Sequence, residues 1–138
     1  MAAFSIFPKR LGTIFKTKAR PKQTTNTKTE NQTGKVNLDG IVVKDFKQKA
    51  LNVGKLGEIL FVNETNFNIT YYPLDNAFLI VITGIPFEQN RLDAEKRFLK
   101  ELDIGKVEAC KLGVYITTPR AYNPKESGIN YRLSFCEQ

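Results

Sequence analysis

The chain has 138 residues, of which 41% are hydrophobic and 25% are charged, and it contains two cysteines and no histidine. The length suits one domain, or a smaller domain with a tail, and the composition is ordinary for a soluble globular protein. The lack of histidine excludes His-based catalytic triads, Cys–His dyads and the common zinc sites. No apolar run approaches the ~18–20 residues that cross a bilayer, so no transmembrane span is expected.

The net charge of +7 is unevenly distributed along the chain. Residues 1–36 hold eight Lys and Arg residues and one acid, Glu30, whereas the chain from Asn37 onward holds 13 basic and 13 acidic residues. The positive excess therefore belongs to the amino-terminal segment, and the remainder is neutral.

Residues 1–36 are predicted to form a basic disordered tail with a short amphipathic segment. A helix is expected from Pro8 to about Lys16, because proline suits a first helical turn. The apolar side chains near one face of this segment are candidates for a membrane interface: Phe4, Phe7, Leu11 and Phe15. Residues 16–35 are rich in Thr, Asn, Gln and Lys and contain no large apolar residue, which predicts a disordered linker.

The tail also supplies candidate contacts to an anionic surface: Lys9, Arg10, Lys16, Lys18, Arg20 and Lys22. Binding through these cations would weaken steeply as the salt concentration rises. The neighbouring aromatic residues suit a membrane interface better than a phosphate backbone, and the neutral body has no recognisable nucleic-acid motif. Nucleic-acid binding, a solvated linker and a mitochondrial-type presequence stay open as alternatives.

The segment after the tail gives mixed signals. Residues 41–51 suit a short amphipathic helix with Val43, Phe46 and Ala50 on one face, and residues 58–62 suit a strand.

A β-hairpin is predicted next. Residues 67–72 alternate between apolar and polar side chains, as in a half-buried strand. Residues 77–83 are apolar and β-branched on both faces, as in a central strand. The sequence PLDN between them has the composition of a tight turn.

Residues 86–104 carry the strongest helix signal. Their apolar stripe is Ala94, Phe98 and Leu102, spaced by four residues. Two i,i+4 ion pairs, Arg91–Glu95 and Arg97–Glu101, are expected on the solvated sides of this helix.

The remaining elements are a short helix at 106–111, a strand at 114–118, a loop at 119–130 and a final strand at 131–135. The predicted fold is a two-layer α+β domain with a mainly antiparallel sheet and helices on one face, in the order β-β-α-α-β-loop-β.

This globular domain is expected to span residues 37–138 and to be best defined over 59–136. It contains both cysteines, Cys110 and Cys136, which lack the spacing of a zinc cluster or of a thioredoxin-type motif. A disulfide would tie the final strand to the helical layer and stabilise the fold by about 3 kcal/mol, and it requires Cα atoms within about 7 Å. Two reduced, partly buried thiols are the alternative.

The run PLDNAFLIVITGIPFEQNRLDAEKRFLKELDIGKVEACKLGVYITTP, followed by NYRLSFC, resembles the carboxy-terminal domain of small uncharacterised bacterial proteins, notably from candidate-phyla lineages. The resemblance covers about residues 66–136 and includes the EACKL and LSFC segments. It implies an extracytoplasmic domain, supports a Cys110–Cys136 bond and names no activity. Such proteins usually carry an amino-terminal membrane anchor and a polar linker, whereas the front of this chain shows no apolar anchor.

Together these features predict a non-enzymatic interaction domain without cofactor, metal ligand or catalytic residue. The expected partner is a protein or an anionic membrane surface, and the candidate contact loop carries Arg120, Tyr122 and Lys125. A hydrolase using Ser127 or Ser134 lacks any supporting motif. The expected location is extracytoplasmic or membrane-associated, with the cytoplasm as the alternative.

Overall fold

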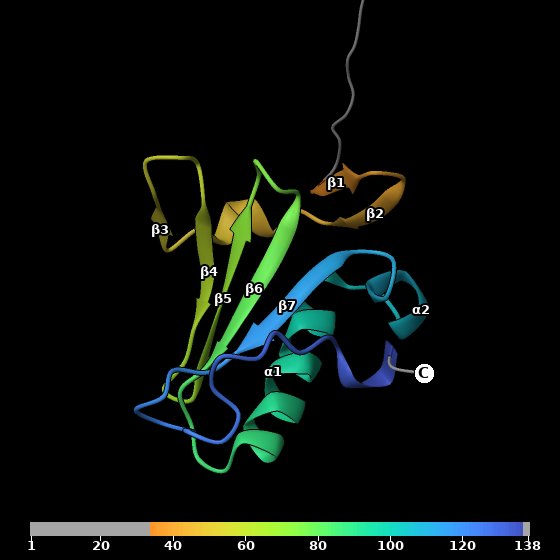
Figure 1. Ribbon diagram of the computed structural model, residues 1–138. Coiled ribbons are helices and arrows are strands. Elements are labelled where there is room, and N and C mark those ends of the chain that lie inside the picture. Colours follow the sequence, from red (N-terminus) through yellow and green to blue (C-terminus); the bar gives the residue numbers. More distant parts are fainter. Residues whose placement is uncertain (1–33, 137–138) are drawn as a thin grey trace, which may run out of the picture. The chain divides into compact units, whose positions relative to one another are not determined.

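The computed structural model describes residues 34–136, which form a two-stranded sheet, a five-stranded sheet and two α-helices (Figure 1). The chain is thus a mixed α+β protein, as the sequence predicted. The expected helix at 8–16, the linker, and the cationic and apolar candidates of the tail lie outside the described residues.

The helix expected at 41–51 is wrong, because two strands and a 3₁₀ helix occupy this region. β1 (Lys35–Leu38) and β2 (Ile41–Lys44) form the small sheet, and η2 (Phe46–Lys49) follows. The β-branched run of β2 favours a strand. Asp45 then caps η2 by accepting a hydrogen bond from the Lys47 backbone N–H at 3.1 Å.

The large sheet has the order β3-β4-β5-β6-β7 (Figure 1). Its strands are β3 (Asn52–Val53), β4 (Ile59–Asn63), β5 (Phe67–Tyr72), β6 (Ala77–Ile82) and β7 (Gly113–Thr117). The first three pairings are antiparallel, and β6 pairs with β7 in parallel. A parallel pair needs a long crossover, and the two α-helices provide it.

The predicted hairpin is confirmed by the uninterrupted pairing of β5 with β6 from Phe67↔Ile82 to Tyr72↔Ala77. β5 alternates between buried and half-buried residues, as its sequence indicated. On the neighbouring strand, a bulge between Leu60 and Val62 interrupts the alternation, so that Phe61 and Val62 are both buried.

The predicted long helix is α1 (Phe87–Leu102), and the short one is α2 (Lys106–Ala109). The apolar stripe expected for α1 is confirmed, because Ala94, Phe98 and Leu102 are fully buried. α1 packs against β5 and β6, where the Phe98 ring meets the Phe78 ring edge-on at 5.0 Å between centroids.

The final strand predicted at 131–135 is wrong. Tyr131 forms a single antiparallel bridge with Ile116 of β7, and the chain then turns into the 3₁₀ helix η3 (Ser134–Cys136). Contacts from α1 and α2 hold this segment away from the edge of the sheet.

Candidate functional site

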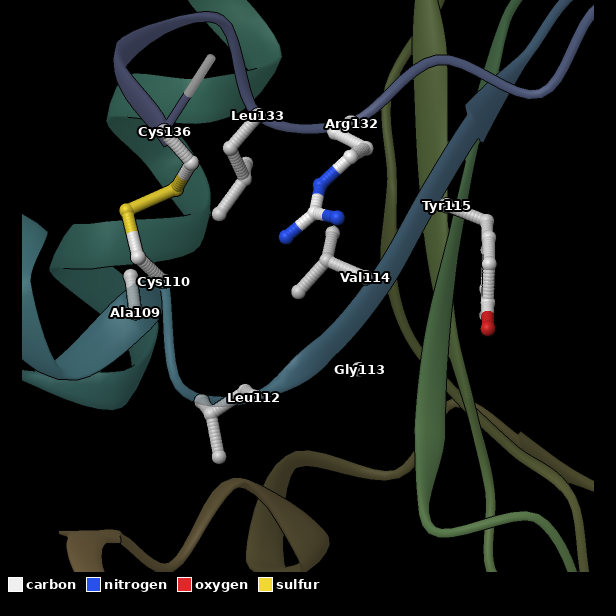
Figure 2. A pocket seen from close by; sticks show the side chains of 9 residues that line it. All are labelled: Ala109, Cys110, Leu112, Gly113, Val114, Tyr115, Arg132, Leu133 and Cys136. Atoms are coloured by element: carbon white, nitrogen blue, oxygen red, sulfur yellow. A yellow bond between two sulfur atoms is a disulfide. The ribbon is translucent and has the colours of Figure 1, made fainter. Parts of the chain in front are cut away.

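Cys110 and Cys136 form a disulfide bond, with their Cα atoms 5.5 Å apart. The predicted pairing is therefore confirmed. Cys110 ends α2 and Cys136 ends η3, so the bond fixes the carboxy-terminal segment to the short helix (Figure 2).

A cavity of about 150 Å³ lies beside this bond and is lined by both cysteines and by Val114, Arg132 and Leu133, among others (Figure 2). Small-molecule sites usually measure 300–1,000 Å³, so this space is too small for most ligands. We interpret it as a packing gap between α2 and the carboxy-terminal segment.

A buried ion pair on α1 holds the same segment at a second point. Arg91 Nε lies 3.3 Å from Glu95 Oε2, and the two side chains are 9% and 4% exposed. Arg91 Nη2 also donates a hydrogen bond of 2.6 Å to the backbone carbonyl of Arg132, and its guanidinium lies over the Tyr131 ring at 5.1 Å.

The Glu95 carboxylate completes this attachment. It accepts hydrogen bonds from the backbone N–H and the hydroxyl of Ser134, at 2.7 and 2.6 Å. The solvated position expected for Arg91 and Glu95 is therefore wrong, because residues 131–134 cover this side of α1. The pair therefore attaches the carboxy-terminal segment to α1.

The second ion pair of α1 is also partly buried. Glu101 accepts hydrogen bonds from Arg97 Nε at 2.7 Å and from Lys49 Nζ at 3.0 Å, and Arg97 Nη1 binds Glu64 at 2.6 Å. Burial raises the pKa of Glu101, but the two cationic partners outweigh it and hold that pKa below its ordinary value. The hydrogen bonds that Arg97 donates to Glu101 and Glu64 raise the pKa of Arg97 above its ordinary value. The network joins α1 to η2 and to Glu64, the residue after β4.

The loop after β7 is anchored by two buried polar side chains. Thr118 Oγ1 donates to the Ile82 carbonyl at 2.7 Å, and Asn123 Nδ2 donates to the Gly84 carbonyl and to Thr118 Oγ1, both at 3.0 Å. These contacts give the loop a defined shape.

The predicted partner residues Arg120, Tyr122 and Lys125 are all exposed on this loop. Tyr122, for example, is 43% exposed. Their role as a contact surface stays a prediction.

The strand positions that alternate with the core-facing ones form a second, partly exposed face of the large sheet, which we call the open face. Strand pairing defines its members: Asn52, Leu60, Asn63, Asn68, Thr70, Tyr72, Ala77, Leu79, Val81, Gly113, Tyr115 and Thr117. None of them carries a charge, although charged residues make up 25% of the chain. Tyr115 is 49% exposed, and its side chain points away from β7 on the side opposite to Leu133 (Figure 2).

Sequence reasoning did not identify the open face as a site. The alternation of β5 places Asn68, Thr70 and Tyr72 on a common side, and this is the feature of the sequence that points toward the open face. The strands that continue this surface could be ordered only from the three-dimensional pairing.

Two negative findings apply to residues 34–136. No helix in this range combines the length and the apolar character that a bilayer crossing requires. Likewise, no group of three or more His, Cys, Asp or Glu side chains within it is arranged to hold a metal ion.

No protein-family model, curated protein or solved structure matches this chain. The resemblance of residues 66–136 to small bacterial domains therefore stays a prediction.

Proposed function

We propose that this chain is a non-enzymatic binding domain, stapled by the Cys110–Cys136 disulfide, whose helices cover one face of the sheet while the open face contacts a partner. The observation that carries the proposal is the lack of charge at the strand positions that form the open face. Ordinary protein surfaces stay soluble by interspersing charges of both signs. The cores of protein interfaces are instead depleted in charged residues and enriched in tyrosine.

The chemistry of the open face defines the partner it suits. Its tyrosines, asparagines and threonines offer uncharged hydrogen-bonding groups beside the apolar Leu79 and Val81. An uncharged, hydrogen-bonding partner fits this surface, whereas an anionic membrane or a nucleic acid would find no cation on it. The predicted loop with Arg120, Tyr122 and Lys125 would then be a separate, secondary contact.

An extracytoplasmic or membrane-surface location belongs to the same proposal. Structural disulfides persist mainly in oxidising compartments, which supports it. The resemblance to extracytoplasmic bacterial domains points in the same direction.

Photocrosslinking in cells that express the full chain tests the contact face. A benzophenone amino acid replaces Tyr115 on the open face or, as the matched control, Val107, which is 68% exposed on α2. We expect a discrete adduct from position 115, and its loss when Thr70→Glu places a charge in the same row. Equal adducts from both positions, or none from position 115, would overturn the proposal.

A second candidate function rests on the charge distribution. Eight basic residues against one acid within residues 1–36 suit attachment to anionic lipid. The full chain should bind vesicles containing anionic lipid more tightly than neutral vesicles or duplex DNA. The double variant Phe7→Ser with Phe15→Ser should weaken vesicle binding, and equal binding to neutral vesicles would contradict this candidate.

A further inference from the structure

Two hollows on the open face share Tyr72 as a common wall. One, of about 550 Å³, is lined by Tyr72, Ala77, Leu79, Tyr115, Asn130 and Asp75, among others. The other, of about 300 Å³, is lined by Tyr72, Leu60, Thr70, Asn52, Asn63 and Asn68, among others. The hollows therefore adjoin one another on the face of the sheet.

One wall of the larger hollow is formed by the small side chain of Ala77. Ala77 of β6 pairs with Tyr72 on one side and with Gly113 on the other. A larger side chain in place of Ala77 would occupy part of the hollow.

Four asparagines of the hollows differ in their bonding from other asparagines of the described range. Among residues 34–136, the hydrogen bonds formed by side chains do not involve Asn52, Asn63, Asn68 or Asn130. By contrast, Asn76, Asn90 and Asn123 each form a side-chain hydrogen bond within this range. A carboxamide both donates and accepts, so these four side chains suit the hydroxyl or amide groups of a ligand.

The tyrosines add a second kind of contact. The face of an aromatic ring is electron-rich and attracts the weakly positive C–H groups of a flat apolar surface. Tyr72 and Tyr115 offer such rings with Leu79 between their strands, and their hydroxyls add hydrogen-bonding capacity.

Charge narrows the class of ligand. No Lys or Arg from the described part of the chain is among the lining residues of either hollow, and Asp75 and Glu58 line one each. These carboxylates repel phosphates, sulfates and uronic acids. The hollows therefore suit a ligand that is neutral, rich in hydroxyl or amide groups, and apolar on its ring faces.

On the premise that the open face is the contact surface proposed above, we infer that it binds an uncharged carbohydrate chain. The sugar rings lie on Tyr72 and Tyr115, and the four asparagines bind the hydroxyl and acetamido groups. Five strands at about 4.8 Å spacing make the sheet on the order of 20 Å wide, enough for several sugar units. A protein segment or a second copy of this chain is the competing occupant.

Titration of the ¹⁵N-labelled full chain, followed by NMR, tests this inference. The probes are chitotetraose and cellotetraose, with a sulfated heparin tetrasaccharide as the charged comparison. We expect saturable shifts at β5, β6, β7 and Asn130 with a neutral probe, and weaker or no shifts at these same positions with the sulfated one. No shift there with either neutral probe at about 10 mM, or tighter binding of the sulfated probe at these positions, overturns the inference.

Variants of matched exposure sharpen the test. Tyr115→Ala should weaken glycan binding about tenfold. Leu92→Ala, on α1 and at a side chain of similar exposure (44% against 49%), should leave it unchanged. Equal effects of the two variants would overturn the inference, and thermal unfolding of Tyr115→Ala checks that its fold is intact. A protein adduct from position 115 without glycan binding would contradict the carbohydrate inference alone, and it would still support the proposed contact face.

Discussion

The two faces of the large sheet come from the same strands but differ in their chemistry. The core-facing side carries residues such as Ile69, Phe78 and Ile80, which α1 and its neighbours bury almost completely. The open face carries Tyr72, Tyr115 and a set of uncharged polar residues that stay partly exposed. Burial explains why the first face excludes charge. Burial does not explain the lack of charge at the strand positions of the second face, and the proposed contact face rests on this difference.

The largest effect should come from the core-facing side. Phe98→Ala should lower the free energy of unfolding by about 3–5 kcal/mol, because it removes a fully buried ring and leaves a cavity. The open-face variant Leu79→Ala should cost less than about 1 kcal/mol. Denaturant unfolding of both variants checks this difference. Similar costs would show that the open face is covered within the protein.

Loss of the disulfide should come next. The double variant Cys110→Ser with Cys136→Ser should lower the free energy of unfolding by about 3 kcal/mol. The reason is that it opens the loop between the two cysteines, which are 26 residues apart in the sequence. Reduction of the wild type should give the same change. An unchanged unfolding midpoint would mean that the ion pair of α1 alone holds the carboxy-terminal segment.

A smaller effect is expected at the hydroxyl that Glu95 binds. Ser134→Ala should cost about 2 kcal/mol, because it removes a partly buried hydrogen bond to a charged group. The control is Ser127→Ala, whose hydroxyl donates to the Pro124 carbonyl in an exposed loop and should cost less than about 1 kcal/mol. Thermal or chemical unfolding of the two variants compares the sites directly.

The Glu101 network predicts a pH dependence of stability. The folded-state pKa of Glu101 lies below its ordinary value of 4.5, so its contribution is complete above that pH and is lost as the pH falls through the folded pKa. Glu101→Gln should therefore flatten the acid limb of the stability curve. The exposed carboxylate variant Glu108→Gln should leave that limb in place. An acid limb unaffected by Glu101→Gln would contradict the assignment.

The smallest effect should fall on the open face itself. Thr70→Ala should change the free energy of unfolding by less than about 0.5 kcal/mol. Thr118→Ala should cost about 1 kcal/mol, because Thr118 is buried and donates to the Ile82 carbonyl. Equal destabilisation by the two variants would indicate a structural role for the open face.

The parts of the fold that sequence predicted well depend on local patterns. The β5–β6 hairpin follows from alternation and turn composition, and α1 follows from the spacing of Ala94, Phe98 and Leu102. The disulfide was favoured from the position of its cysteines around one loop.

The parts that sequence did not predict depend on contacts between distant residues. Residues 131–135 alternate like a strand, but Glu95 and the disulfide draw Ser134 and Cys136 toward the helices. The same contacts bury Arg91, which the i,i+4 spacing alone had placed in solvent. No local pattern reports which distant segment will cover a helix, so both errors have one cause.

The Tyr131 bridge also hinders the addition of strands from other molecules to the edge of the large sheet. The Tyr131 N–H and C=O pair with Ile116 at 2.8 Å each, which blocks the outer edge of β7 near its carboxyl end. At the other edge, β3 comprises only Asn52 and Val53. Long rows of free backbone groups on an edge strand invite strand addition and fibril formation, and neither edge offers one. Many copies crowded together would thus resist stacking edge to edge, while the open face of each sheet stays available.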